Sequence, residues 1–432
     1  MLEKLFHLKE NKTNVKTEII AGLTTFMTMA YIIALNPNLL TGFGSNGTPA
    51  LWNAIFLATC LASAVGMFVM AFVANKPFAM APGMGLNSFF AVVVVNIVSI
   101  TGLSYVESFQ AGLCIILIEG IVFLILSVLN VREKIVDAIP LGVRLGIAPA
   151  IGLMLMNIGF GSNVGVGAAS QFYVMRDFFG ALTPSLAKSN MGDDYSTMVL
   201  TVVTMFIGLF VIVILAQKGV KAAVILGMLA ASIIYWAGQA IFLHTNPFAS
   251  LSTASFVPAF GDMASTTLFK FNFKGFLEIG WFTAITLVIT FCIIDMFDTI
   301  GTLVGTASRA GMLDKDGKMP KMKEALLADA VGTVAGSVTG TSTVTTFVES
   351  ASGVEAGGRT GLTALTTGIV FLACMFIAPI AAIIPAAATS AALIYVGVLM
   401  VTGLKNINFG DITQVLPVAI MLISMPISGS IG

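Results

Sequence analysis

The chain has 432 residues, of which 57% are hydrophobic and only 10% charged, and its 21 basic and 21 acidic side chains balance. Soluble proteins are about 45–50% apolar even with glycine counted, and about 25% charged. Here glycine adds another 43 residues to the apolar total. This balance excludes a soluble enzyme, a disordered chain and a nucleic-acid-binding protein, and it predicts a multi-pass membrane protein.

Apolar runs of about 20 residues, long enough to cross roughly 30 Å of hydrocarbon, recur along the whole chain. We expect thirteen segments: 18–36, 51–74, 77–100, 106–129, 135–159, 197–216, 220–243, 277–307, 324–340, 341–357, 360–383, 386–403 and 412–430. Two long polar stretches between them, 160–196 and 244–276, have room for short surface helices.

The distribution of lysine and arginine supports this segment count. With the N-terminus inside, sixteen of the 21 basic residues fall on the inner side, four fall in outer loops and Arg144 lies within a span. Inner loops of membrane proteins carry such an excess of positive charge. We therefore expect an inner or plasma membrane protein with a cytoplasmic N-terminus.

Few side chains are suited to metal or redox chemistry. The four cysteines all lie in apolar segments without CxxC spacing: Cys60, Cys114, Cys292 and Cys374. We expect them to be small buried hydrophobic residues, and we expect no metal or other cofactor. The only histidines, His7 and His244, lie outside the apolar segments. Proton chemistry within the membrane would therefore fall to carboxylates.

The third and tenth segments are interrupted. The third reads NKPFAMAPGMGLNSFFAVVVV, with prolines and glycines in an apolar run, and the tenth reads GTSTVTTFVESASGVEAGG. The β-branched stretch Thr341–Phe347 favours an extended strand. Extended backbone at membrane depth is tolerated only where it is buried in protein or lines a cavity.

The two breaks occupy corresponding places in two units. The first unit has seven spans and begins inside, so the second unit begins outside, at segment eight. Segment ten is therefore the third segment of the second unit, as segment three is of the first. Two units of opposite topology with matching breaks are typical of inverted-repeat secondary transporters. Helices that begin at the breaks would direct their N-termini at a site near the midplane. The alternative is that glycine and proline only allow close helix packing.

Carboxylates inside spans are the candidate functional residues, because each costs roughly 2.5–3.5 kcal/mol on insertion scales. The candidates are Glu119, Asp295, Asp298, Asp329 and Glu349, with Asp137 and Glu355 nearer the segment edges. Asp295 and Asp298 share a helix face with Thr302 by their spacing. Glu349 falls where the strand of segment ten should turn into helix, and so faces the same cavity.

Several of these acids also have a structural interpretation. Asp295 could pair with a neighbouring hydroxyl or amide, Glu119 could accept a buried hydrogen bond from another span, and Asp329 could be a cap-like acid in a first helical turn. For Asp298 and Glu349 we favour function. Two acceptors on facing elements suit a small planar ligand with several N–H donors, and a carboxylate can also take up a proton.

Three stretches carry a family resemblance: AMAPGMGLNSFF at 79–90, MFDTIGTLVG at 296–305 and ALLADAVGTVAGSVTGTSTVTTFVESASGVEAGGRTGLTA at 325–364. They resemble the nucleobase–ascorbate transporter family, and above all its AzgA-like branch of adenine/guanine/hypoxanthine permeases. The resemblance extends weakly over the whole chain.

The resemblance implies an all-α fold of fourteen segments in two inverted sevens, with short strands in segments 3 and 10. It implies a core domain made of 1–130 and 275–384, and a gate domain made of 131–274 and 385–432. The gate domain would mediate a homodimer. Only thirteen segments are found here, so we expect that the last gate helix lies beyond Gly432.

The resemblance also implies proton-coupled import of purine nucleobases, with no nucleic-acid partner. The substrate-binding acids of the family match Asp298 and Glu349, and Thr302 stands where the uracil branch has histidine. The residues Phe347, Val348, Met84 and Asn87 would line the site. Asp298, Glu349 and Asp295 would be the proton-coupling candidates. Ser350 replaces an asparagine of the xanthine and uracil branches, which favours a 6-substituted purine.

Two other functions compete with this reading. An anion transporter or channel of the sulfate or bicarbonate type could use the same inverted repeat, although Glu349 at the break opposes anion binding and Arg359 lies further along. A membrane-embedded enzyme would need a nucleophile–histidine pair or a set of metal ligands, and the spans contain neither. We therefore expect a transporter and no enzyme.

Overall fold

The computed structural model describes residues 2–42, 46–129, 140–160, 195–309, 311–312 and 319–428. Within this part, nine helical stretches are long and apolar enough to cross a membrane, and Leu145–Phe160 and Ile412–Pro426 form shorter apolar helices. The chain is therefore a multi-pass membrane protein, as its composition predicts.

The first half contains the helices α1 (Leu2–Phe6), α2 (Val15–Met29), α3 (Ile32–Leu40), α4 (Pro49–Val69), the π-helical turn η2 (Met70–Ala74), α5 (Met84–Thr101), α6 (Tyr105–Val128), α8 (Leu141–Phe160), α11 (Tyr195–Gln217) and α12 (Ala223–Phe242). Strand β1 (Met80–Pro82) lies between η2 and α5. The predicted segments of this half correspond to these helices: the first to α2 and α3 together, the second to α4 with η2, and the third to a strand followed by a helix, while the start of 135–159 lies outside the described residues.

The second half contains η5 (Ala249–Thr253), α13 (Phe260–Thr266), α14 (Phe273–Glu278), α15 (Trp281–Arg309), α16 (Met322–Thr339), strand β2 (Val344–Thr346), α17 (Ser350–Glu355), α18 (Gly361–Ala373), η6 (Cys374–Ile377), α19 (Ala378–Ala382), α20 (Ala386–Val401), η7 (Thr402–Asn406) and α21 (Ile412–Ser428). The short helices expected in 244–276 are confirmed as η5, α13 and α14. Most of 160–196, and Asp137, lie outside the described residues.

The breaks in segments 3 and 10 form the only sheet of the described residues. β1 and β2 pair antiparallel, with Met80 opposite Thr346 and Pro82 opposite Val344. The pairing continues on both sides, because Gly83 N donates to Thr343 O at 3.1 Å and Phe347 N donates to Ala79 O at 2.9 Å. All six strand residues are buried, so their backbone groups satisfy one another away from lipid.

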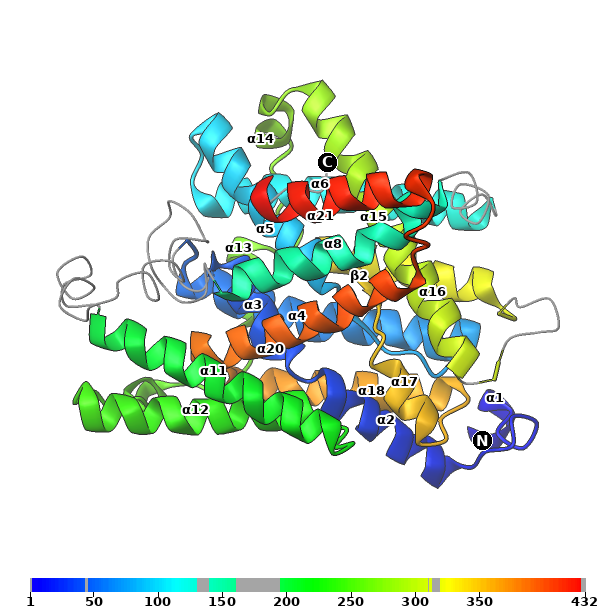
Figure 1. Ribbon diagram of the computed structural model, residues 1–432, viewed down its shortest axis with the longest axis horizontal. Helices are drawn as coiled ribbons and strands as arrows, with labels where there is room; N and C mark the ends of the chain where they lie inside the picture. Colours follow the sequence, from blue (N-terminus) through cyan, green and yellow to red (C-terminus); the bar gives the residue numbers. More distant parts are fainter. Residues whose placement is uncertain are drawn as a thin grey trace.

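The helices pack in two groups that have fewer contacts with each other than within themselves. In one group α16 packs on α4 and α6, and α18 packs on α2 and α4. In the other group α8 packs on α20 and α21, and α11 packs on α12 and α20. Figure 1 shows α20 between α8 and the α11–α12 pair. The two strands belong to the first group.

Small residues allow the first group to pack closely. A Cβ atom added at Gly120 of α6 would lie 2.7 Å from Val334 Cγ2 of α16, closer than real Cβ contacts. Such close approach of helix backbones is the usual way in which membrane helices associate without a hydrophobic driving force. Gly120 therefore serves the close packing of α6 on α16.

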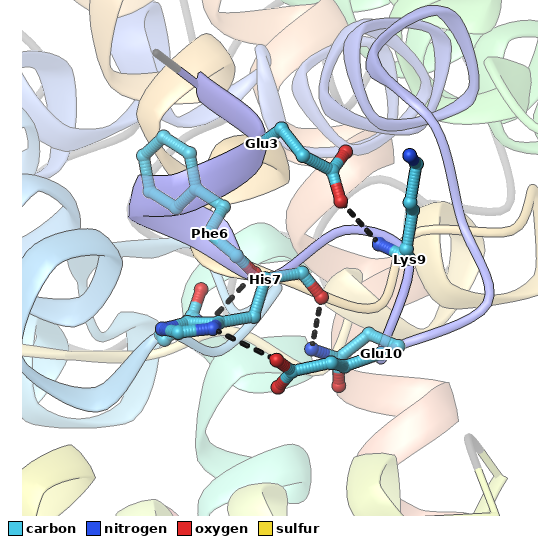
Figure 2. A network of polar contacts seen from close by, with 7 residues as sticks. Glu3, Phe6, His7, Lys9 and Glu10 are labelled. Carbon is cyan, nitrogen blue, oxygen red and sulfur yellow. Dashed lines mark hydrogen bonds and ion pairs between the residues drawn. The ribbon is translucent and has the colours of Figure 1, made fainter.

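The N-terminal segment is anchored to the start of this group. Phe6 is fully buried and stacks on Phe72 with ring centroids 6.0 Å apart. Figure 2 shows the turn that follows, in which Lys9 N donates to Glu3 Oε1 at 2.9 Å and His7 Nδ1 lies 3.4 Å from Glu10 Oε1. The helix α1 therefore ends in a locally hydrogen-bonded turn beside η2.

One buried acid outside the strand region joins two spans. Glu18 of α2 is fully buried, and its carboxylate accepts hydrogen bonds from Arg359 N at 2.8 Å and from Thr363 N at 3.2 Å. It also accepts from Thr360 N and from the Thr363 hydroxyl. These amides belong to the start of α18, so Glu18 acts as a cap for a neighbouring helix.

Candidate functional site

The strand pair brings two helix starts from opposite halves of the chain together. α5 begins at Met84, directly after β1 and Gly83, and α17 begins at Ser350, four residues after β2 ends. No side chain caps the start of α5. The 18-residue α5 therefore presents open N–H groups and a positive dipole end at the break.

Asp298 reaches this break from α15. A Cβ atom added at Gly83 would lie 3.6 Å from Asp298 Oδ2 and 2.5 Å from Thr345 Cγ2, so only glycine fits between them. Asp298 is partly exposed, and nothing in the described part of the chain donates a hydrogen bond to it. The carboxylate is therefore available to a ligand.

The C-terminal half of α15 has an open face beside Asp298. Apart from the neighbouring backbone of α15 itself, no atom of the described residues lies within 4 Å of a Cβ atom added at Gly301 or Gly305, and both glycines are exposed. Thr302, one helical turn after Asp298, is partly exposed. Asp298 and Thr302 thus share a face that borders open space.

Glu349 lies at the turn between β2 and α17, and a residue that sequence reasoning missed fixes its position. The hydroxyl of Tyr31 donates to Glu349 Oε1 at 2.8 Å, and Tyr31 is only 2% exposed. No other side chain of the described residues donates to Glu349. One carboxylate oxygen is therefore held by Tyr31, at the bend between α2 and α3, and the other is left for a ligand.

The remaining predicted lining residues divide into two kinds. Val348, next to Glu349, is 55% exposed, whereas Met84 and Phe347 are 5% and 6% exposed at the two helix starts. Asn87 is fully buried, and its amide donates to Asn36 Oδ1 at 2.7 Å and accepts from the Ser342 hydroxyl. The structure thus brings Val348, Met84 and Phe347 to the break and places Asn87 behind it.

The side chain of Ser350 is also hydrogen-bonded within the protein. Its hydroxyl oxygen accepts from Ala79 N at 2.9 Å, and the residue is fully buried. The hydrogen bond links the start of α17 to the residue before β1. This serine therefore stabilises the crossing of the two broken segments.

Asp295 and Asp298 do not face the same surroundings, although they are three residues apart. Asp295 is fully buried, and its Oδ1 accepts from the Thr299 hydroxyl at 3.2 Å. The same hydroxyl lies 2.7 Å from Asp329 Oδ1 and 2.7 Å from Thr345 Oγ1. The hydroxyl pairing considered for Asp295 is thus confirmed, and we call these four residues the acid–threonine cluster.

The interpretation of Asp329 as a first-turn acid is wrong. α16 begins at Met322, so Asp329 lies in its second turn and is fully buried. Its contact with Thr299 crosses from α16 to α15. The expected start of the span at residue 324 lies only two residues after the start of α16, so the error concerns the position of Asp329 within the helix and not the boundary of the span.

Glu119 does accept a hydrogen bond from another span. The hydroxyl of Thr343, just before β2, donates to Glu119 Oε2 of α6 at 2.7 Å. Thr343 and Thr345 alternate along this strand segment, so both side chains lie on one face of it. Thr343 contacts the carboxylate on α6 and Thr345 contacts the Thr299 hydroxyl of α15, so the segment is held to both helices.

The structure gives no set of metal ligands among the described residues. Within them, no group of three histidine, cysteine, aspartate or glutamate side chains could hold a metal ion. The four cysteines are free thiols and buried. The chemistry of the break is therefore that of hydrogen-bond acceptors, hydroxyls and helix N-termini.

The comparison with protein families identifies the chain. Residues 16–431 match the Xan_ur_permease model, described as the Permease family. The chain belongs to this family of permeases. The match covers both broken segments and both groups of helices.

Curated relatives match over nearly the whole chain. It is 38% identical to a putative permease of Methanocaldococcus jannaschii, MJ0326, over 100% of this chain and 89% of the relative. It is 36% identical to the adenine permease AdeP of Escherichia coli, over 100% and 87%. It is 37% identical to the guanine/hypoxanthine permease PbuO of Bacillus subtilis, over 99% and 90%.

Solved structures confirm the fold. The transmembrane domain of the cyanobacterial bicarbonate transporter BicA superposes with a TM-score of 0.67 at 16% identity, covering 96% of this chain and 97% of that one. SLC26A9 superposes with a TM-score of 0.59 at 11% identity, covering 96% and 63%. The chain thus has the inverted-repeat fold of these transporters, with two short strands at the breaks.

Proposed function

We propose that the protein is a secondary transporter that imports a purine nucleobase, namely adenine, guanine or hypoxanthine. The observation that carries the proposal is the meeting of two acids from different segments, Asp298 and Glu349, at the crossing of the strands. The names of the adenine permease and the guanine/hypoxanthine permease relatives support the same class of substrate.

The two carboxylates would bind the N–H edge of the base. Ionised carboxylates accept short, charge-assisted hydrogen bonds, which are roughly twice as strong as neutral ones. Met84, Phe347 and Val348 would contact its apolar faces. Thr302 would supply a hydroxyl from the next turn of α15, while Asn87 and Ser350 would support the strands that carry the site.

Transport would be coupled to protons through acids, since both histidines lie outside the spans. The acid–threonine cluster supports this. The Thr299 hydroxyl has a single proton but lies within 3.2 Å of three oxygens. It can donate to only one of the two carboxylates, Asp295 or Asp329, at a time, so a proton on the other carboxylate would complete the set of hydrogen bonds. Asp295 would thus join Asp298 and Glu349 as a candidate for proton exchange during transport.

The two groups of helices would be the moving parts. We assign the core domain to 1–130 and 275–384, and the gate domain to 131–274 and 385–432. The core would carry the bound base across the membrane by an elevator-like or rocking motion against the gate, and the gate would form a homodimer. The excess of inner lysine and arginine supports a cytoplasmic N-terminus in the inner or plasma membrane.

Anion transport of the sulfate or bicarbonate type is the alternative, and its support is the fold alone. Arg359, which follows α17, has Nη1 turned toward the backbone, where it donates to Val354 O at 2.6 Å and to Gly358 O at 2.7 Å. Two carboxylates at the site disfavour an anion.

Uptake of radiolabelled hypoxanthine, guanine and adenine in cells that lack their own carriers tests the proposal. We expect a protonophore to abolish uptake. We expect Asp298→Ala and Glu349→Ala each to reduce uptake by roughly a hundredfold or more, because each removes a charged partner of the bound base. Exposed Glu278→Ala is the matched control. Full uptake by both site variants would refute the site, and competition by sulfate but not by purines would favour the anion transporter.

A further inference from the structure

A hollow lies away from the strand crossing. It has a volume of about 370 Å³ and lies where α3 ends, α4 begins and the α19–α20 connection passes. Asn38, Trp52 and Asn53 line one side, and Ala382 and Ile384 line the other. Small-molecule sites in proteins occupy roughly 300–1,000 Å³, so the hollow has the size of a ligand site.

The hollow is close to the site but distinct from it. Tyr31, which holds Glu349, directly precedes α3, and Asn38 lies seven residues further along the chain. At about 1.5 Å per helical residue, the two residues are separated by about 10 Å along the helix. The hollow therefore lies at the opposite end of α3 from the proposed base-binding acids.

Two hydrogen bonds fix which groups the asparagines present. Trp52 Nε1 donates to Asn38 Oδ1 at 2.7 Å, and Asn53 Nδ2 donates to Asp262 Oδ2 at 2.7 Å. With its carbonyl bonded to Trp52, Asn38 still has both N–H groups for a ligand. With one N–H bonded to Asp262, Asn53 still has its carbonyl for a ligand. The hollow thus offers one donor and one acceptor side by side.

A flat aromatic ring lies between these amides. Trp52 is partly exposed, and its indole stacks on Phe56 with ring centroids 5.5 Å apart and planes 15° apart. The hydrogen bond to Asn38 and the stacking on Phe56 hold the indole in one orientation. A rigid indole beside a donor and an acceptor is the combination that binds a nucleobase, by stacking and by edge hydrogen bonds.

We propose that this hollow is an outer binding site for a purine base, which stacks on Trp52 and pairs its edge with Asn38 and Asn53. The identity of the ligand rests on the proposed function. Asn38 and Trp52 belong to the first group of helices, whereas Ala386, which also lines the hollow, opens α20 of the second group. The site therefore spans the boundary at which the two groups would move, and its affinity depends on their relative position.

Tryptophan fluorescence of the purified full chain tests the site directly. The chain has three tryptophans, so Trp236→Phe with Trp281→Phe leaves Trp52 as the only indole. We expect adenine or hypoxanthine to quench it saturably, and the quenching to persist after Asp298→Asn with Glu349→Gln. The absence of saturable quenching, or its loss after Asp298→Asn with Glu349→Gln, would overturn the proposal of a purine site at Trp52.

The matched control keeps a different tryptophan. Trp52→Phe with Trp281→Phe leaves Trp236, which lines a separate hollow of about 850 Å³ at the end of α12. We expect no saturable quenching there, and equal quenching in both proteins would contradict a specific site at Trp52. If uptake of purines fails in the unmodified protein, the proposed function falls; if uptake is intact but Trp52 is not quenched, only this inference falls.

Transport kinetics provide a second measurement. Trp52→Leu and Asn53→Leu should each raise the KM for purine uptake, by roughly tenfold for the tryptophan, while the maximal rate changes little. Surface expression and thermal stability of both variants distinguish a binding effect from misfolding. An unchanged KM in both well-folded variants would contradict the proposal.

Discussion

Tyr31 and Glu349 are 318 residues apart in the chain, yet one hydrogen bond of 2.8 Å joins them. The acids themselves could be predicted from sequence, because a carboxylate in an apolar segment is costly and therefore conspicuous. A tyrosine in the first span carries no such signal, since its ring suits an apolar setting and its hydroxyl needs only one partner. The orientation of Glu349 was therefore beyond sequence reasoning.

Removing the Tyr31 hydroxyl should weaken substrate binding. We expect Tyr31→Phe to raise the KM for purine uptake by about fivefold. Glu349 loses a hydrogen bond whose net free-energy contribution is about 1 kcal/mol. Initial uptake rates over a range of purine concentrations measure this. Tyr105→Phe is the control, because the Tyr105 hydroxyl donates to the backbone carbonyl of Leu40 at 2.6 Å and does not contact Glu349. A KM unaffected by Tyr31→Phe would remove Tyr31 from the site.

At the scale of elements, hydropathy was sufficient for the spans and β-branching for the strand of segment ten. The strand β1, Met80–Pro82, has no β-branched residue and was expected only from the family resemblance. The pairing partner and register of each strand could not be predicted from the sequence. β1 and β2 contain three residues each, and any register would bury them equally well. The roles of Asn87 and Ser350 depend on that register. Sequence reasoning placed Asn87 at the ligand and treated Ser350 as a position that distinguishes substrates, whereas the structure gives both a hydrogen bond within the protein.

The start of α5 also packs closely against α8 of the other group of helices. A Cβ atom added at Gly85 would lie 2.5 Å from Ile151 Cγ2. We expect Gly85→Val to reduce the maximal uptake rate at least tenfold, because overpacking costs about 1–3 kcal/mol at a contact that has to slide. Ile151→Ala in the same protein should restore part of the rate, and the absence of any rescue would place the defect elsewhere.

The cap that Glu18 provides to α18 should matter for stability more than for transport chemistry. Glu18→Ala leaves several buried donors without their acceptor, so we expect a loss of roughly 1–3 kcal/mol and a lower melting temperature in detergent. Glu278, which is exposed and 3.9 Å from Lys274, provides the control, and Glu278→Ala should change little. Equal melting temperatures for all three proteins would contradict the capping role.

At the scale of the whole molecule, few of the polar contacts between described residues join the two groups of helices. One is the hydrogen bond from Lys221 Nζ, beside α12, to Ser352 O of α17 at 3.2 Å. Lys221 is exposed, so the contact contributes roughly 0–1 kcal/mol. A contact of this size can bias the position of α17 without preventing its movement.

A cysteine reporter measures that bias. Val348→Cys places a thiol at an exposed position of the site, while the four native cysteines are buried. We expect Lys221→Met to slow maleimide labelling of this thiol by up to about fivefold, because the conformation that exposes Val348 loses up to about 1 kcal/mol. Lys218→Met, at a nearby exposed lysine, should leave the rate unchanged, and equal effects of both changes would contradict a role of the Ser352 contact.

The antiparallel strand pair has a consequence for the synthesis of the protein. Met80 and its partner Thr346 are 266 residues apart. At roughly 5–20 residues per second, β1 emerges from the ribosome about 13–53 s before β2 exists. Unpaired backbone cannot rest against lipid, so β1 has to be sheltered by insertion machinery or by water during that interval. Ribosome stalling between the two strands should therefore expose the third segment to proteases, and the ligand site is completed only late in biogenesis.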